Sequence, residues 1–195
     1  MDELDRVEAK QAWRVEVRRA RRERAQRGGR AEAGTALADA VLALVWQLSA
    51  GAVCRVTAYE SRPTEPPTEA LVDALRAAGH AVLLPITGAD RTLEWDDSGR
   101  RRPPESIGSA SLVLTPGLAV DRAGRRLGQG GGYYDAALAH VPAGVPVVTL
   151  LWDDELVEGP LPTQDHDRRV DGVLMPTAGV VWLGRPRPEW TGPAR

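Results

Sequence analysis

The stretch Leu112-Val-Leu-Thr-Pro-Gly-Leu-Ala-Val-Asp-Arg-Ala-Gly-Arg-Arg-Leu-Gly-Gln-Gly-Gly-Gly-Tyr-Tyr-Asp135 decides the fold class of this chain of 195 residues. It begins with the apolar run 112–115, which predicts a buried strand that ends at Pro116-Gly117. Residues 122–132 are rich in glycine, and Tyr133 begins a predicted helix. A strand without polar alternation is typical of a parallel sheet that is covered on both faces. The stretch therefore predicts an α/β protein.

The same pattern continues outward along the chain in both directions. Apolar residues at helical spacing predict three helices. The first ends near residue 25, and the other two cover residues 31–49 and 68–78. The first of these depends on Leu4, Val7, Trp13, Val17 and Ala20. Apolar runs predict further strands over 53–59, 81–85, 145–152 and 170–175, and the polar segment 86–109 predicts a hairpin and an exposed loop. We expect a single three-layer α/β/α domain with a mostly parallel sheet over residues 1–185, followed by a Pro- and Arg-rich tail over 186–195.

Composition and the distribution of apolar residues argue against a disulfide-bonded, a secreted or a membrane-spanning protein. Hydrophobic residues make up 43% of the chain and charged residues 27%, which is ordinary for a globular protein. Cys54 is the only cysteine, so an intramolecular disulfide is impossible and a reducing compartment is expected. The N-terminus has no apolar signal region, and the longest apolar stretch, residues 41–46, is too short to span a membrane. We therefore expect a cytoplasmic protein without a membrane partner.

Charge is unevenly distributed, which raises one alternative function. The net charge is −2, but residues 1–30 contain ten basic and six acidic side chains. A nucleic-acid-binding module would use the basic stretch formed by Arg14, Arg18, Arg19, Arg21, Arg22, Arg24 and Arg27. Glu16 and Glu23 interrupt this stretch, and the rest of the chain is acidic. Nucleic acid is therefore not the expected partner.

The glycine-rich segment is the strongest signal for a ligand. Gly128 and the run Gly130–Gly132 follow a predicted strand and precede a predicted helix, so successive backbone N–H groups can form a concave phosphate-binding nest. Arg125 and Arg126 lie just upstream as possible donors, and Asp135 lies within reach of a Mg²⁺ ion on that phosphate. The spacing matches neither the P-loop nor the dinucleotide-binding fingerprint. The alternative is a flexible connector followed by two core tyrosines.

The residues from Pro116 to Asp121 and from Gly124 to Asp135 closely resemble the signature of the 5-formyltetrahydrofolate cyclo-ligase family. The resemblance extends along nearly the whole chain. It includes Lys10-Gln-Ala-Trp-Arg14, Tyr59-Glu60-Ser61 with Glu65 and Thr68, and Leu161-Pro162 with His166-Asp167 and Val170-Asp171-Gly172-Val173.

This resemblance implies an enzyme that converts ATP and 5-formyltetrahydrofolate into ADP, phosphate and 5,10-methenyltetrahydrofolate, with Mg²⁺ as cofactor. Family members are usually monomeric. The implied ATP-binding residues are Lys10, Arg14, Arg126, Leu127, Gly128, Gln129, Gly130, Gly131, Gly132, Tyr133 and Tyr134. The implied folate-binding residues are Glu60, Glu65, Tyr133 and Tyr134, and the implied Mg²⁺ contacts are Asp135 and Asp167.

The chain also departs from the family pattern at several positions. Gln129 stands where many relatives have arginine or an aromatic residue, and Glu155 stands where glutamine is usual. Leu93 and Trp95 replace the usual Met-x-Phe of the pocket loop. The departures at Gln129 and around residues 93–105 support a second hypothesis, an ATP-binding homologue that has lost or changed its folate substrate.

Overall fold

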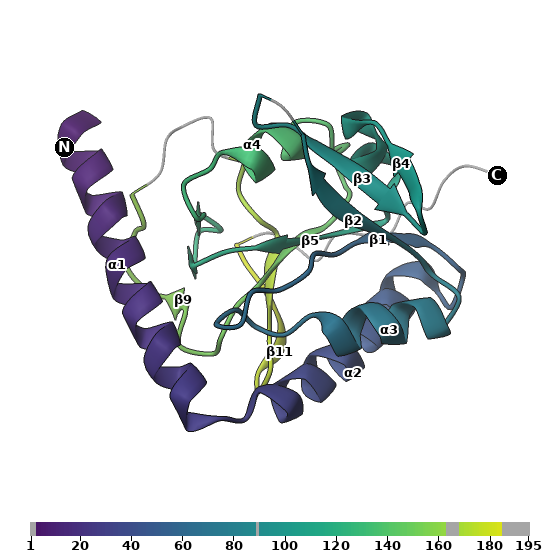
Figure 1. Cartoon of the computed structure of the whole chain (residues 1–195), viewed down its shortest axis with the longest axis horizontal. Coiled ribbons are helices and arrows are strands. Elements are labelled where there is room, and N and C mark those ends of the chain that lie inside the picture. The colour runs from purple at the N-terminus through teal and green to yellow at the C-terminus, as the bar shows by residue number, and fades with distance from the viewer. Residues whose placement is uncertain (1–2, 89, 163–167, 185–195) are drawn as a thin grey trace.

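The computed structural model describes residues 3–88, 90–162 and 168–184, and an eight-stranded sheet forms its centre (Figure 1). Five neighbouring strands are parallel, in the order β10-β8-β5-β1-β2. Their bounds are β1 Arg55–Thr57, β2 Ala81–Thr87, β5 Leu112–Pro116, β8 Val147–Leu150 and β10 Gly172–Met175. Antiparallel strands extend both edges: β11 (Gly179–Trp182) pairs with β10, and β3 (Leu93–Asp97) with β4 (Arg100–Arg102) continues from β2. The expected largely parallel α/β sheet is confirmed.

Helices cover both faces of this sheet, which explains the unbroken apolar runs. Leu112 and Leu114 of β5 pack in the cluster formed with α2 (Arg30–Ser49) and α3 (Glu69–Ala77). Val113 between them packs in the opposite cluster, with the short helix η1 (Pro104–Ser109) and with α4 (Tyr133–Leu138). Successive side chains of a strand point to opposite faces, so a strand buried on both faces shows no polar alternation.

Helix α1 (Glu3–Arg27) lies along one side of the molecule, next to β9 (Figure 1). It packs through Trp13 and Val17 on a second, three-stranded sheet. That sheet has the order β7-β6-β9, with bounds Arg126–Leu127, Ala119–Asp121 and Leu156–Val157. The prediction that Leu4 and Val7 share the packed face of this helix is wrong, because 75% and 54% of their surfaces are exposed.

The segment 86–109 differs in part from its prediction. The hairpin is present as β3 and β4, but the rest is not an exposed loop. Ile107 of η1 is fully buried, and so is Trp95 of β3, whose indole Nε1 donates a 3.0 Å hydrogen bond to the Pro104 carbonyl. The segment therefore widens the sheet and covers one of its faces.

Helix α2 is the one described helix that is long and apolar enough to cross a membrane, judged by length and composition alone. Its apolar side is buried in the core with α3 and the central strands, through Leu37, Val41, Leu44, Val45 and Leu48. The helix is accordingly a core helix of the domain.

Candidate active site

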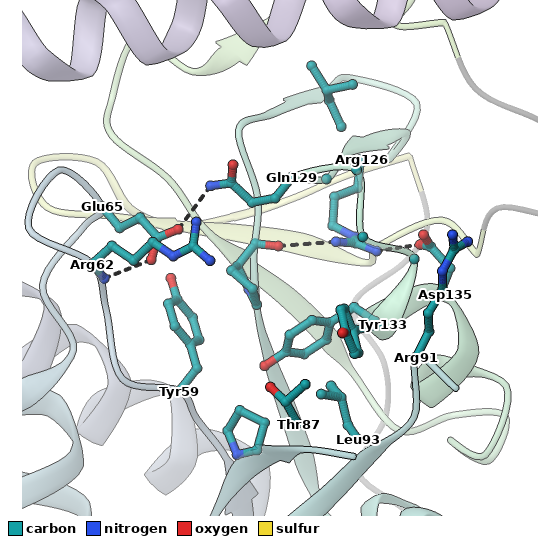
Figure 2. A pocket seen from close by; sticks show the side chains of 18 of the residues that line it. Tyr59, Arg62, Glu65, Thr87, Arg91, Leu93, Arg126, Gln129, Tyr133 and Asp135 are labelled. Carbon is teal, nitrogen blue, oxygen red and sulfur yellow. Dashed lines mark hydrogen bonds and ion pairs between the residues drawn. The ribbon is translucent and has the colours of Figure 1, made fainter. Parts of the chain in front are cut away.

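A pocket of about 750 Å³ opens at the carboxyl ends of the parallel strands β1, β2 and β5 (Figure 2). Ligands of open α/β sheets bind at this edge, and the volume suits a small molecule. The lining residues are Lys10, Arg14, Arg18, Tyr59, Glu60, Arg62, Glu65, Pro85, Thr87, Arg91, Leu93, Pro116, and all of residues 126–135.

The glycine loop, residues 128–132, forms one wall of the pocket between β7 and α4. Gly130 and Gly132 have φ values of +102° and +74°, in the left-handed region that favours glycine. The Arg14 Nε atom donates a 3.1 Å hydrogen bond to the Gly128 carbonyl. Burial, and then the neighbouring Arg18, lowers the pKa of the Arg14 guanidinium, against the opposite effect of Asp135. Since arginine stays protonated in proteins, the loop faces concentrated positive charge.

Arg126 joins the base of the loop to its far end. Its Nη2 donates a 2.6 Å hydrogen bond to Asp135 Oδ1, and its Nη1 donates a 3.2 Å bond to the Pro116 carbonyl (Figure 2). The guanidinium also lies 5.9 Å from the centre of the Tyr134 ring. The sequence suggested Arg125 as a further phosphate donor. Its Nε instead pairs at 2.6 Å with the buried Asp121, so Arg125 does not join this group.

The opposite wall is the loop that carries Glu65, a side chain only 5% exposed. Its Oε2 accepts a 2.9 Å hydrogen bond from the Arg62 backbone N–H, and its Oε1 accepts a 3.0 Å bond from the Gln129 amide (Figure 2). Arg30 of α2 holds the same loop through Ser61 Oγ at 2.8 Å and the Glu65 carbonyl. Burial, and then the Glu65 carboxylate, raises the pKa of Tyr59 well above its ordinary value, so this wall presents a neutral hydroxyl.

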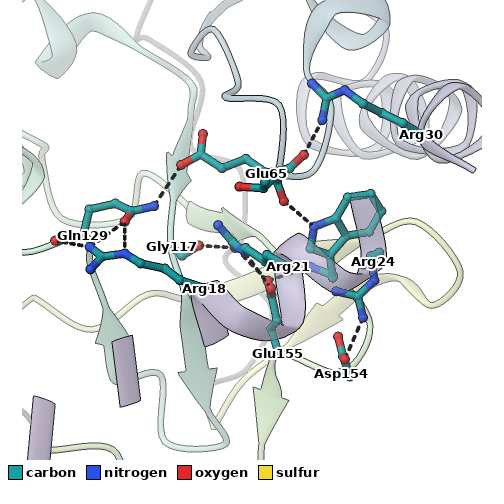
Figure 3. Close-up of polar contacts among 11 residues, drawn as sticks. Arg18, Arg21, Arg24, Arg30, Glu65, Gly117, Gln129, Asp154 and Glu155 are labelled. Carbon is teal, nitrogen blue, oxygen red and sulfur yellow. Dashed lines mark hydrogen bonds and ion pairs between the residues drawn. The ribbon is translucent and has the colours of Figure 1, made fainter. Parts of the chain in front are cut away.

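A buried ion pair joins α1 to the segment just before β9 (Figure 3). Arg21 Nε and Nη2 donate to the two carboxylate oxygens of Glu155 at 2.7 and 2.8 Å, and Nη2 also donates to the Gly117 carbonyl at 2.6 Å. The Trp152 backbone N–H donates to Glu155 Oε2 at 2.9 Å. Burial raises the pKa of the Glu155 carboxyl, and Arg21 opposes this shift. The departure at Glu155 thus supplies a carboxylate to a buried guanidinium.

The structure brings together most of the residues singled out in the sequence. Every expected ATP-binding and folate-binding residue lines this one pocket, and so does Asp135. Asp167 lies outside the described residues. Trp95 belongs to the core, so only Leu93 of that pair reaches the pocket.

Three lining arginines were not expected in the site. Arg18 could have been found, because Lys10, Arg14 and Arg18 are spaced four residues apart and share one face of α1. Arg62 and Arg91 lie in irregular segments, where no periodic pattern marks the facing side.

The pocket combines a glycine loop, several basic side chains and a buried carboxylate at the edge of a parallel sheet. These features are typical of an α/β enzyme that acts on a phosphorylated ligand and on a second substrate with polar N–H groups. The chain belongs to the 5-formyltetrahydrofolate cyclo-ligase family, whose sequence pattern it matches over residues 6–176. The family relationship shows an ATP-dependent ligase of folate one-carbon metabolism with 5-formyltetrahydrofolate cyclo-ligase activity.

Individual relatives are similar to this chain in sequence or in fold. The 5-formyltetrahydrofolate cyclo-ligase of Mycolicibacterium smegmatis is 38% identical over 149 residues, which cover 66% of this chain and 76% of the relative. The fold is similar to 5,10-methenyltetrahydrofolate synthetase from Mycoplasma pneumoniae, with a TM-score of 0.68 at 16% identity over 84% of this chain and 96% of that one. The synthetase of Aquifex aeolicus gives 0.65 at 21% identity, over 89% and 94%.

Proposed function

We propose that the nucleotide phosphates bind between the glycine loop and α1, and that the pterin ring of 5-formyltetrahydrofolate binds at Glu65. The observation that carries this proposal is the single pocket in which both walls face each other. Lys10, Arg14 and Arg126 supply cations for the phosphates, and the glycine loop supplies backbone N–H groups. Helix α4 has only six residues, so the side-chain cations provide most of the positive potential.

The other wall suits the folate. The Glu65 carboxylate accepts one hydrogen bond on each oxygen, which leaves acceptor capacity for the amino and ring N–H groups of a pterin. Pro85 and Leu93 give the pocket an apolar wall for ring packing, and the rings of Tyr133 and Tyr134 also line it. Glu60 lines the same pocket five positions before Glu65, and we assign its carboxylate to the folate end as well.

Asp135 is the described residue that fits a Mg²⁺ ion. The carboxylate is half exposed at the pocket, and its Oδ1 pairs with Arg126. Magnesium in phosphoryl-transfer sites takes one or two carboxylates together with substrate phosphates and water, so a single carboxylate beside the loop is sufficient on the protein side. Within the described residues, no three His, Cys, Asp or Glu side chains gather around a metal position. The ion, when bound, neutralises phosphate charge.

The reaction needs positioning more than a protein nucleophile. The formyl oxygen of 5-formyltetrahydrofolate attacks the γ-phosphorus, and ADP leaves. N10 then attacks the activated formyl carbon, the ring closes, and phosphate and the N10 proton depart. Lys10, Arg14 and Arg126 stabilise charge on the transferring phosphoryl group, and the pocket walls hold the formyl oxygen against it. Removing one such donor typically lowers the rate by about 10² to 10³, which corresponds to about 3–4 kcal/mol.

An absorbance assay tests this function directly. Purified protein with ATP, Mg²⁺ and 5-formyltetrahydrofolate should produce the methenyltetrahydrofolate band, with one phosphate released per product. Omission of ATP, or chelation of the metal, should abolish the signal. Hydrolysis of ATP without any growth of the band would instead favour the homologue with an altered substrate.

We propose further that the enzyme acts as a monomer in the cytoplasm. The single cysteine, Cys54, is unbridged, which suits a reducing compartment. Light scattering at the assay concentration should give the mass of one chain, 21.0 kDa. A mass of two chains would contradict the monomer.

A further inference from the structure

One side chain connects the two walls of the pocket. Gln129 belongs to the glycine loop, yet its Nε2 donates a 3.0 Å hydrogen bond across the pocket to Glu65 Oε1 (Figure 3). Arg18 of α1 donates to the Gln129 side-chain oxygen at 3.1 Å and to its backbone carbonyl at 3.0 Å. The hydrogen-bonded series Arg18–Gln129–Glu65 therefore joins α1, the glycine loop and the folate wall.

We propose that Gln129 is a positioning residue that couples the two substrates, so that nucleotide binding tightens folate binding and the reverse. This inference rests on the proposed function, because it takes the loop as the phosphate site and Glu65 as the pterin site. It goes beyond that function, since nothing in the reaction itself requires the two substrates to bind cooperatively.

The folate wall depends on Gln129 for the direction of one carboxylate. The backbone at Glu65 is already held by Arg30, and Trp152 Nε1 donates to the Thr64 carbonyl at 3.1 Å. Within the part of the chain that the structure describes, two donors orient the carboxylate itself, the Arg62 backbone N–H and the Gln129 amide. Fixing the amide therefore fixes the edge that meets the pterin.

The nucleotide wall controls where that amide lies. Gln129 is flanked by Gly128 and Gly130, and glycine loses more conformational freedom on ordering than any other residue. Phosphates bound by the loop would hold its backbone, including the carbonyl that Arg18 contacts. The nucleotide thus orders the Gln129–Glu65 hydrogen bond, which orients the carboxylate that binds the folate. Binding of one ligand therefore favours binding of the other, which is positive coupling.

Calorimetry measures this coupling without catalysis. The dissociation constant of 5-formyltetrahydrofolate is determined with and without a saturating non-hydrolysable ATP analogue and Mg²⁺. The wild-type ratio should be on the order of 10, within the usual range for coupled sites. Gln129→Met keeps the side-chain length but removes its amide, and should bring the ratio close to 1. Arg18→Met cuts the connection from α1 and should also reduce the ratio.

Thr87→Ala is the matched control, because Thr87 lines the same pocket outside this connection and its variant should keep the wild-type ratio. A wild-type ratio at or below 1, or a Gln129→Met ratio equal to that of the wild type, would overturn the inference while leaving the proposed function intact. Failure of the wild-type protein to bind either ligand would overturn both. If Gln129→Met does not fold, the Arg18→Met ratio decides.

Discussion

At the scale of single residues, the Arg21–Glu155 pair has the largest expected effect on stability. Both side chains are at most 5% exposed, so removing one partner leaves a buried charge without compensation. Glu155→Ala should lower the free energy of unfolding by about 3–5 kcal/mol. Glu155→Gln should cost less, because the amide oxygen still accepts a hydrogen bond from Arg21. Urea denaturation at pH 7 measures both.

The exposed pair Arg122–Glu158 is the control for that series. Its carboxylate is 78% exposed, and pairs of this kind contribute little. Glu158→Ala should leave the urea midpoint unchanged. A Glu155→Ala midpoint equal to that of Glu158→Ala would contradict the structural importance of the buried pair.

Residue types in the sequence were sufficient to predict most of the residues that line the candidate site. The contacts between these residues could not be predicted. The motif around Gly128–Gly132 predicted a phosphate loop, and it does line the pocket. The partner of Gln129 could not be predicted, because Glu65 lies 64 positions earlier in the chain. The two come together only when β1 and β5 are neighbours in the sheet.

At the scale of elements, the turn between β6 and β7 is built around the buried Asp121. Its oxygens accept hydrogen bonds from the backbone N–H groups of Ala123, Arg125 and Leu161 at 2.9, 3.0 and 2.9 Å, and from Arg125 Nε at 2.6 Å. Burial acts to raise the pKa of Asp121, but the hydrogen bonds from Leu161 and Arg125 outweigh it, and the net shift is downward.

This shift predicts a pH-dependent contribution to stability. A carboxyl whose folded pKa is depressed stabilises the fold fully above its unfolded pKa, about 3.9, and loses that contribution as the pH falls through its folded pKa. Asp121→Asn should therefore lower the free energy of unfolding at pH 7, and the difference from the wild type should shrink only below about pH 4. Denaturation curves at a series of pH values test this. A constant difference down to the lowest pH would contradict the assignment.

Some of the helices and strands could be predicted from the sequence, and others could not. Core helices and parallel strands were found because each buries a long apolar face, as α2 does through Leu37 and Val41. The strands β6, β7 and β9 were missed, since two or three residues are too few to show a period. The apolar stripe of α1 was misleading at Leu4 and Val7, where helical spacing is present but both side chains are largely exposed.

The basic stretch of α1 shows why charge in a sequence needs its three-dimensional partners. Arg19 pairs with Glu16 and Glu23, Arg21 with Glu155, and Arg24 with Asp154. Arg14 and Arg18 point instead to the glycine loop. These five of the seven arginines of the stretch thus have partners within the molecule, which weakens the case for a nucleic-acid-binding module.

At the scale of the whole molecule, Lys10 on α1 and Glu65 line the same pocket. In the proposed arrangement, Lys10 belongs to the nucleotide end of this pocket and Glu65 to the folate end. The two ends come from opposite walls, so damage to one should appear mainly in the kinetics of its own substrate. This separation distinguishes the proposed arrangement from a general loss of folding.

Steady-state kinetics of Lys10→Ala and Glu65→Gln, with each substrate varied in turn, is the most direct measurement. We expect Lys10→Ala to lower kcat by about 10² to 10³ and to raise the KM for ATP, while the KM for 5-formyltetrahydrofolate changes far less. Glu65→Gln should show the reverse pattern, with the larger rise in the KM for the folate. Equal rises of both KM values in both variants, or full activity of Lys10→Ala, would contradict the two-ended site.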